Sequence, residues 1–163
     1  MTARKDAHRL AEEGRVDPAA PAHATGGIDV AASPEEVWDA LATVANWPRF
    51  RADVTDAETE GPADAPADAG RAFRWRAGGH PVESRFAITD RPSRLSWSNA
   101  APGLTASCVY EFDRTPSGHT RIRAAESMDA SAVAPHLDHA ALAEGIRTWL
   151  EGIKAFVEER AHG

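Results

Sequence analysis

The sequence has few of the features that mark disulfide-bonded, membrane-spanning or nucleic-acid-binding proteins. Its 163 residues include one cysteine, Cys108, so no intramolecular disulfide can form. This is typical of a reducing compartment, and we expect a cytoplasmic protein. No apolar run reaches the roughly 18 residues of a membrane span, and the stretch "MTARKDAHRLAEEGRVD" lacks the apolar region of a secretory signal. The net charge of −7 argues against nucleic acid and anionic membranes as partners.

The sequence also lacks the motifs of several common enzyme classes. It contains no G-x-S-x-G, P-loop or G-x-G-x-x-G pattern, so acyl-serine chemistry, nucleotide hydrolysis and dinucleotide redox chemistry are not indicated. His136 and His139 are three residues apart, but a metal site needs three or four ligands and no suitably spaced residues complete one. We therefore expect neither a metal nor a cofactor.

Residues 1–24 are rich in Ala, Pro and charge and show no sustained period. This composition predicts a flexible N-terminal arm, and the alternative is an arm that packs over the body. Residues 25–163 have the length and composition of a single domain with its own core.

The stretch "GIDVAASPEEVWDALATVANWPRF" (27–50) predicts one short strand followed by two short helices. Ser33 is placed to cap a helix, with Pro34 at its first position and Glu36 completing a capping box. A stripe of apolar side chains follows, and Trp38 and Trp47 lie beside it.

Between residues 53 and 128 the hydrophobic pattern has a period of two, which predicts half-buried antiparallel strands with one wet face. Turn signals rich in Gly, Pro, Asn and Asp separate about six such strands. From about residue 135 to 160 the period returns to that of a helix. At about 1.5 Å per residue this helix is over 30 Å long, enough to cross a sheet.

This order predicts an α+β fold: a strongly twisted antiparallel sheet of about seven strands wrapped around one long C-terminal helix, with two short helices after the first strand. Several residues on the inward face are small, which would leave space between sheet and helix. They are Ser84, Ala106, Cys108 and Ala124. Apolar concavities of this kind are common ligand sites.

The chain resembles the helix-grip superfamily of START-like, Bet v 1-like (SRPBCC) and polyketide cyclase/dehydrase proteins from about Gly27 to Arg160. The motifs that carry the resemblance are "I-x-V-x-A-S-P-E-E-V-W-D-A-L" (28–41), "W-P-R-F" (47–50), "G-R-A-F-R-W" (70–75), "R-P-S-R-L-S-W" (91–97), "T-R-I-R-A-A-E-S-M" (120–128) and "W-L-E-G-I-K-A-F-V-E" (149–158). The resemblance implies a deep cavity and usually no bound cofactor. The same scaffold hosts cyclases, lipid carriers, hormone receptors and stress sensors, so the fold alone does not give the function.

Glu126 is the first candidate for chemistry. Alternation places it on the inward face with Ile122, Ala124 and Met128, where partial desolvation would raise its pKa and suit a general acid or base. Abscisic-acid receptors, which share the scaffold, have a glutamate in a similar strand context facing their pocket. The alternative is a position near the strand end, where the carboxylate reaches water or pairs with an arginine.

Arg85 and Tyr110 are the other catalytic candidates. Some polyketide cyclases of the resembled family place an arginine in a similar strand, where it polarises a substrate carbonyl. Alternation here favours Ser84 and Phe86 inward and Arg85 outward, and a one-residue register shift would reverse this. Tyr110, the only tyrosine, is a candidate hydrogen-bond donor to a ligand oxygen, and a satisfied core hydroxyl is the alternative.

The residues predicted to contact a ligand are those on the inward faces of the strands and of the long helix. They are Trp75, Ser84, Phe86, Trp97, Ala106, Cys108, Ala124 and Trp149. For the tryptophans the alternative is core packing. For Cys108 it is the role of a small core residue, because nothing marks a neighbouring base.

We therefore expect a monomer or homodimer that binds a small hydrophobic or aromatic molecule in a deep cavity. Two functions use this cavity. The first is cyclisation or dehydration of a polyketide-type substrate, and the second is non-catalytic carriage or sensing of the ligand. A third role, as a protein-binding partner like some relatives, has no exposed apolar patch in the sequence to support it.

Overall fold

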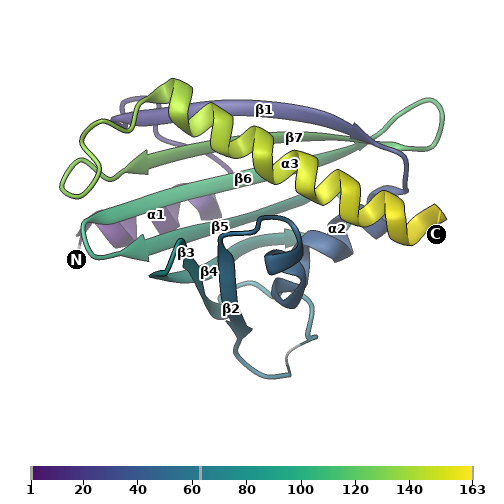
Figure 1. The fold of residues 1–163 in the computed structure, drawn as a ribbon, viewed down its shortest axis with the longest axis horizontal. Helices are drawn as coiled ribbons and strands as arrows, with labels where there is room; N and C mark the ends of the chain where they lie inside the picture. The colour runs from purple at the N-terminus through teal and green to yellow at the C-terminus, as the bar shows by residue number, and fades with distance from the viewer. Residues whose placement is uncertain (1, 63, 163) are drawn as a thin grey trace.

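The structure is a computed structural model of the chain, and it describes residues 2–62 and 64–162. Figure 1 shows its elements, which are in chain order α1 (Thr2–Glu12), β1 (Ala22–Val30), α2 (Pro34–Ala42), the 3-10 helix η1 (Val44–Arg49), β2 (Val54–Thr59), β3 (Ala72–Ala77), β4 (His80–Asp90), β5 (Arg94–Ala101), β6 (Leu104–Arg114), β7 (Thr120–Asp129) and α3 (His139–His162). Of the described helices, none is both long and apolar enough to cross a membrane.

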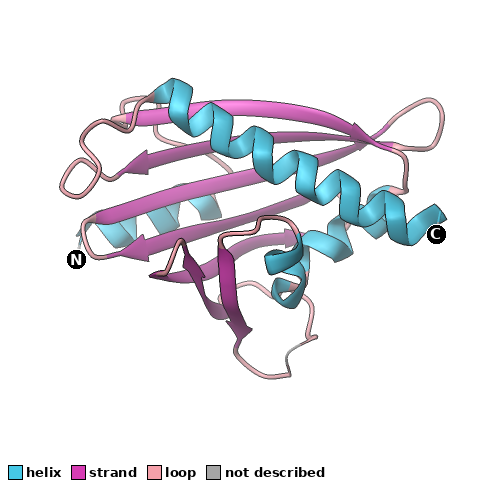
Figure 2. Ribbon diagram, in the orientation of Figure 1, coloured by secondary structure: helices cyan, strands magenta, loops and turns pink. Residues whose placement is uncertain are grey.

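The strands form one antiparallel sheet in the order β1-β7-β6-β5-β4-β3-β2. Figure 2 shows the twisted sheet with α3 running diagonally across one face and α1 behind the other. The predicted α+β helix-grip fold is confirmed, including the seven strands, the two short helices and the long C-terminal helix. We call the face under α3 the inner face and the face under α1 the outer face.

The helix α3 packs along β1 and β7 through one apolar stripe. The buried members of the stripe are Leu142, Ile146, Leu150, Ile153 and Val157. Each fully buried side chain of this size contributes about 1.5–3 kcal/mol relative to an exposed one. The buried positions recur every three or four residues, which confirms the predicted helical period.

Two close contacts bring α3 near the rest of the fold. A methyl group at Gly26 of β1 would press into the Ile146 side chain, and one at Gly152 would overlap the Phe50 carbonyl oxygen. Glycine at these positions lets α3 lie against β1 and against the end of η1.

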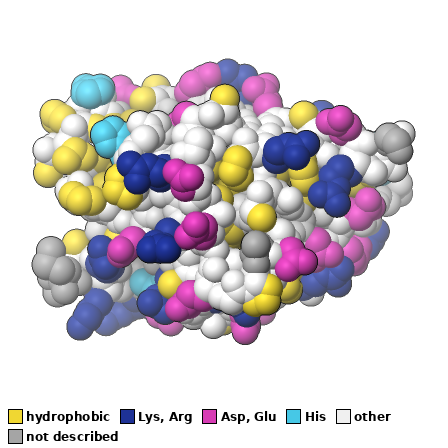
Figure 3. All heavy atoms as spheres, turned by 60° about the horizontal axis from the view of Figure 1, so that its bottom comes forward, with side chains coloured by type: hydrophobic (Ala, Val, Ile, Leu, Met, Phe, Trp, Pro, Cys, Tyr) yellow, Lys and Arg dark blue, Asp and Glu magenta, His cyan; other side chains and the backbone are white. Residues whose placement is uncertain are grey.

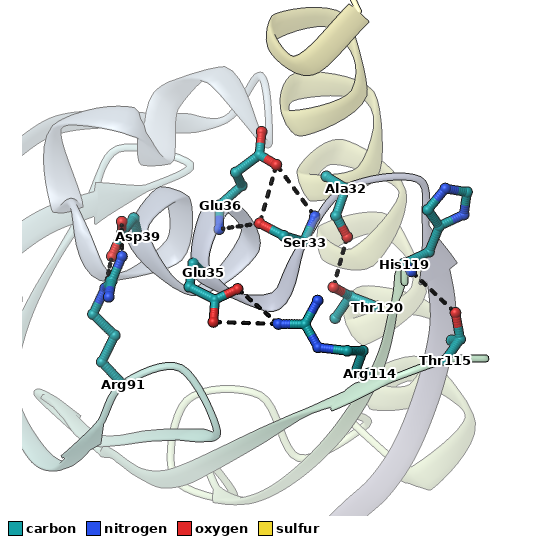
Figure 4. Close-up of polar contacts among 10 residues, drawn as sticks. All are labelled: Ala32, Ser33, Glu35, Glu36, Asp39, Arg91, Arg114, Thr115, His119 and Thr120. Atoms are coloured by element: carbon teal, nitrogen blue, oxygen red, sulfur yellow. Dashed lines mark hydrogen bonds and ion pairs between the residues drawn. The ribbon is translucent and has the colours of Figure 1, made fainter. Parts of the chain in front are cut away.

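The capping box predicted for α2 is present and fixes the start of that helix (Figure 4). The Ser33 hydroxyl accepts from the Glu36 N–H at 3.2 Å, and the Ser33 N–H donates to the Glu36 carboxylate at 3.3 Å. Exposed ion pairs from Glu35 to Arg114 and from Asp39 to Arg91 join α2 to the sheet. Exposed pairs of this kind contribute about 0–1 kcal/mol each, so they orient α2 more than they stabilise it.

The tryptophans of the two short helices, Trp38 and Trp47, pack those helices against the sheet. The Trp38 indole donates to the Arg94 carbonyl at 2.8 Å, which ties α2 to the start of β5. The Trp47 indole is fully buried and donates to the Leu41 carbonyl at 2.9 Å. Both indole N–H groups are therefore satisfied inside the core.

The sequence predicted a flexible arm over residues 1–24. In the structure, residues 2–24 instead pack over the body of the domain, which was the alternative. The helix α1 lies on the outer face with Ala7 and Ala11 buried against it, and β1 already begins at Ala22. The buried apolar residues of α1 are alanines. The helix therefore lacks the large buried apolar side chains that usually reveal an amphipathic helix in a sequence.

Polar contacts hold the N-terminal segment on the sheet. The outer-face hydroxyls of Ser96 and Ser107 donate to the carbonyls of Ala11 and Arg15 at 2.6 and 3.0 Å. The Ser127 hydroxyl accepts from the Asp17 N–H at 3.0 Å. The outer face of β5 and β6 is thus covered, whereas the alternation in the sequence predicted a wet face.

Candidate functional site

A cavity of about 170 Å³ lies between the inner face of the sheet and α3. Residues from η1 and the loop after it, from β3 to β7 and from α3 enclose it. The lining residues are Trp47, Arg51, Trp75, Ala77, Val82, Trp97, Asn99, Leu104, Cys108, Tyr110, Glu126, Met128, Leu142, Gly145 and Trp149.

Aromatic rings form much of the cavity wall. The Trp47 ring is the centre of this cluster, with centroids 5.5 Å from Trp75, 5.2 Å from Trp97 and 5.2 Å from Trp149. The Tyr110 ring stacks on Trp97 at 5.1 Å. Rings packed edge to face and stacked in this way make a rigid apolar surface that suits another aromatic ring.

A line of polar groups crosses the inner face from β3 to β7. The Trp75 indole donates to the Ser84 hydroxyl at 3.0 Å, and Ser84 donates to the Asn99 carbonyl oxygen at 2.6 Å. The Asn99 amide donates to the Cys108 sulfur at 3.6 Å, and the Cys108 side chain interacts with that of Glu126. We call these five residues the polar chain.

The strand register produces the polar chain. Ser84 lies opposite Asn99 in the β4–β5 ladder, and Cys108 lies opposite Glu126 in the β6–β7 ladder. Directly opposed residues of an antiparallel pair share a face and have adjacent side chains. The three hydrogen bonds run from Trp75 toward Cys108, which lies beside Glu126.

Glu126 is only 8% exposed, and burial raises its pKa from 4.5 to about 7. The positive charge of Arg51 and the hydrogen bond from Cys108 oppose this rise by favouring the carboxylate. Close to neutral pH the group is therefore present in both protonation states. A carboxyl group in this condition can accept a proton and return it.

Burial also raises the pKa values of the two other titratable groups that line the cavity beside Glu126. The Cys108 thiol and the Tyr110 phenol both lie well above their ordinary pKa, first because of burial and then because of the nearby Glu126 charge. Cys108 is therefore a thiol that donates, not a thiolate nucleophile. Tyr110 is a neutral phenol that can donate a hydrogen bond.

Arg51 is the only positively charged group among the lining residues. Its guanidinium donates to both carboxylate oxygens of Asp53 at 2.9 and 2.8 Å and lies 5.6 Å from the Trp149 ring centre. Its side chain is 27% exposed, while Trp149 is half-buried. These two residues therefore form the rim between the cavity and solvent.

The structure brings most of the predicted site residues together. Glu126, Tyr110, Trp75, Trp97, Cys108 and Trp149 all line the cavity. Ser84 is in the polar chain behind the wall. Phe86 is fully buried and stacks on Phe73 at 4.4 Å, and Ala106 and Ala124 are buried in the sheet. Phe86, Ala106 and Ala124 therefore pack beside the cavity and are not among its lining residues.

Arg85 does not face the cavity, which corrects its candidacy as a catalytic residue there. It lies opposite Ser98 on the outer face, and its side chain is exposed and donates to the Gly70 carbonyl at 2.6 Å. The reason is strand parity: Ser84 and Phe86 occupy the inward positions on either side of it.

Two polar cavity residues were not identified from the sequence, Asn99 and Arg51. Asn99 stands in "NAAPG", a stretch with a turn composition, and only its pairing with Ser84 shows that it belongs to β5. Arg51 follows η1 in a loop, and its position depends on how η1 packs on the sheet.

His139, the first residue of α3, contacts β1. The His139 ring accepts a hydrogen bond from the His23 backbone N–H at 2.9 Å, and the two rings are 4.2 Å apart. In residues 2–62 and 64–162 no group of three or more His, Cys, Asp or Glu side chains could hold a metal ion.

One family model matches the chain. It carries the description "Polyketide cyclase / dehydrase and lipid transport" and covers residues 21–158. The match runs from β1 into α3, so it includes the whole cavity and leaves α1 outside. Among curated proteins, no significant match exists.

Solved structures share the fold at low sequence identity. Hypothetical protein jhp0584 from Helicobacter pylori is 18% identical with a TM-score of 0.71, over 86% of this chain and 90% of that chain. TTHA0849 from Thermus thermophilus is 14% identical with a TM-score of 0.66, over 86% and 99%. DynU16, from the dynemicin biosynthetic locus, is 15% identical with a TM-score of 0.62, over 83% and 47%. At these identities the likeness concerns the fold alone.

Proposed function

The chain belongs to the polyketide cyclase/dehydrase and lipid transport family, and from this premise we propose that it binds a small hydrophobic or aromatic carbonyl compound beneath α3 and catalyses a proton transfer through Glu126. The observation that carries the proposal is a carboxyl group with a pKa of about 7 that lines an aromatic cavity. A general acid or base works best when its pKa is near the working pH.

The proposed reaction is an aldol-type ring closure. The Glu126 carboxylate removes a proton from the carbon next to a substrate carbonyl, which leaves an enolate. The enolate carbon then forms a bond to a second carbonyl carbon of the same molecule, and the oxygen of that carbonyl takes the electron pair. The protonated Glu126 returns its proton to this oxygen, so one group serves as base and then as acid.

The neighbours of Glu126 suit this chemistry. The neutral Tyr110 phenol and the Arg51 guanidinium both line the cavity and can stabilise negative charge on an enolate oxygen. The polar chain ends at Glu126 and places the Cys108 side chain against its carboxylate. The rigid tryptophan wall would hold the reacting carbons in contact, which lowers the entropic part of the barrier.

The cavity volume limits the substrate. At about 170 Å³ the cavity is close to the roughly 150 Å³ that holds a benzene molecule in an engineered protein, and smaller than the roughly 300–1,000 Å³ of sites for drug-sized ligands. A ligand with a single ring fits the cavity as it stands. A longer chain requires Trp149 and Arg51 at the rim to move aside.

The alternative is a carrier or sensor that uses the same cavity without chemistry. The apolar wall and the lipid-transport part of the family description favour it. The two functions differ in what Glu126 does, because a carrier has no use for its proton.

A deuterium-exchange experiment separates the two functions. Acetophenone has one ring and exchangeable protons next to its carbonyl, and its exchange in D₂O is followed by NMR. We expect the protein to accelerate the exchange and Glu126→Gln to reduce that acceleration at least about 100-fold, the usual minimum contribution of a general base. Glu159→Gln, which changes an exposed residue of α3, is the control. Binding without any accelerated exchange would favour the carrier and refute the proposed catalysis.

A further inference from the structure

A groove lies on the outer face, on the other side of the sheet from the cavity. It has a volume of about 600 Å³ and lies between one flank of α1 and strands β3, β4 and β5. This volume is within the usual range for small-molecule sites. We call it the outer groove.

The outer groove is basic in a protein whose net charge is −7. Only two carboxylates line it, Glu12 and Glu83, against five Lys and Arg side chains. These five are Arg4, Lys5 and Arg9 of α1, Arg74 of β3 and Arg85 of β4. In Figure 3, Lys and Arg side chains gather at the lower left, on the side of the molecule where the N-terminus lies.

The local structure explains why these cations converge. On α1, the side chains that face the groove are spaced so that they fall on one flank of the helix, while Ala7 and Ala11 face the sheet. On the strands, alternation that sends Trp75 and Ser84 inward sends Arg74 and Arg85 outward. The groove is therefore a product of α1, which lies outside the family match.

Carboxylates neutralise only part of the basic charge. Arg4 pairs with Glu83 at 3.4 Å, and Arg74 pairs with Glu58 at 3.1 Å. Within residues 2–62 and 64–162, Lys5, Arg9 and Arg85 form no ion pair with a carboxylate. Three positive charges therefore remain available to a ligand.

Both polar and apolar side chains form the base of the outer groove, beneath these cations. The His8 ring, which is partly buried, hydrogen-bonds to the Ser98 hydroxyl at 2.8 Å, and its other nitrogen lies 3.9 Å from the Glu12 carboxylate. Beside it, the half-buried Ala72 presents carbon surface to the groove, and the buried Ala100 lies under its floor. A ligand with an organic part has something to contact besides charge.

We propose that the outer groove binds a small organic phosphate of about mononucleotide size. Three unpaired cations suit a doubly charged group better than a single carboxylate, and guanidinium groups match the oxygen geometry of phosphate. In this proposal Arg9 and Arg85 contact the phosphate oxygens from the two sides of the groove, and Lys5 adds a third charge. The organic part lies on the Ala72 surface. The site is separate from the cavity and does not depend on the function proposed for it.

The test is isothermal titration calorimetry at low ionic strength with ADP and inorganic phosphate as probes. We expect ADP to bind, and Arg9→Gln and Arg85→Gln each to weaken binding about tenfold, because each removes a charge-assisted hydrogen bond. Arg147→Gln is the matched control, since Arg147 is an exposed residue of α3 that pairs with Glu144 and Glu151. All three positions are exposed, and thermal unfolding verifies that each variant is folded.

The outcomes separate clearly. ADP binding that is weakened by the two groove substitutions but not by Arg147→Gln supports the proposal. Absence of ADP binding, or equal affinity in wild type and both groove variants, overturns it. Inorganic phosphate that binds as tightly as ADP overturns the organic part of the ligand assignment, because the carbon surface would then contribute nothing.

Discussion

Replacing Glu126 with Gln tests the state of the buried carboxyl group through protein stability. In the folded protein its pKa is about 7, whereas the ordinary value is 4.5. The folded state therefore holds the proton over a pH range in which the unfolded state has released it. Stability from this group is complete below about pH 4.5, is lost as the pH rises toward 7, and stays lost above it.

The size of the effect follows from the shift. Each pKa unit corresponds to about 1.4 kcal/mol, so a rise from 4.5 to about 7 costs the wild-type protein about 3 kcal/mol above pH 7. Gln has nearly the same shape and never ionises, so Glu126→Gln avoids this cost. We expect the variant to match wild type near pH 4.5 and to exceed it by up to about 3 kcal/mol at pH 8.

Urea unfolding of both proteins between pH 4.5 and pH 8 measures the difference. Carboxylates whose pKa is lowered, such as Asp29 beside Arg121 and Glu158 beside Lys154, change stability with the opposite sign, but they are common to both proteins and cancel. Glu159→Gln on the exposed side of α3 is the control for loss of one surface charge. A difference between wild type and Glu126→Gln that does not change with pH would refute the argument that burial raises this pKa.

Three further predictions concern the polar chain, the contact of α3 with the end of η1, and Glu126 as the catalytic base. Asn99→Ala removes the amide that bonds to Ser84 and Cys108, so we expect a loss of about 1–3 kcal/mol in urea unfolding, and a loss below about 0.5 kcal/mol would mean that the polar chain is not formed. Gly152→Ala places a methyl group on the Phe50 carbonyl and should destabilise the protein by at least about 1–3 kcal/mol. In the control Gly145→Ala the new methyl group meets no atom within 4 Å, so we expect this substitution to stabilise α3 by up to about 1 kcal/mol. Equal effects of the two substitutions would contradict the close contact of α3 with η1. The exchange rate of acetophenone should rise with pH through about pH 7 and then level off, because the carboxylate is the active form, and a rate that is flat across this range would exclude Glu126 as the base.

The sequence predicted the strands and their inward residues because alternation needs only local information. A strand with one buried face repeats every two residues, and this placed Trp75, Trp97, Cys108 and Glu126 on the cavity side. The same alternation favoured an outward-facing Arg85, a position from which it cannot act in the cavity, and the structure places it there.

The remaining features depend on contacts between segments that are distant in the chain. Asn99 lies in a stretch with turn composition, and its place in the polar chain follows from its pairing with Ser84. Arg51 reaches the cavity only because η1 packs on the sheet. The helix α1 was missed since its buried side is mainly alanine, a residue that gives a weak hydrophobic period.

Native mass spectrometry of the freshly purified protein tests the central claim, a cavity that holds a small apolar molecule, most directly. Wild type and Trp149→Ala are compared, because removal of the indole at the rim enlarges the cavity entrance. We predict a non-covalent adduct of small mass on wild type, or uptake of added acetophenone, and a wider range of bound masses on Trp149→Ala. Two proteins that both remain empty, with and without added single-ring compounds, would contradict the account.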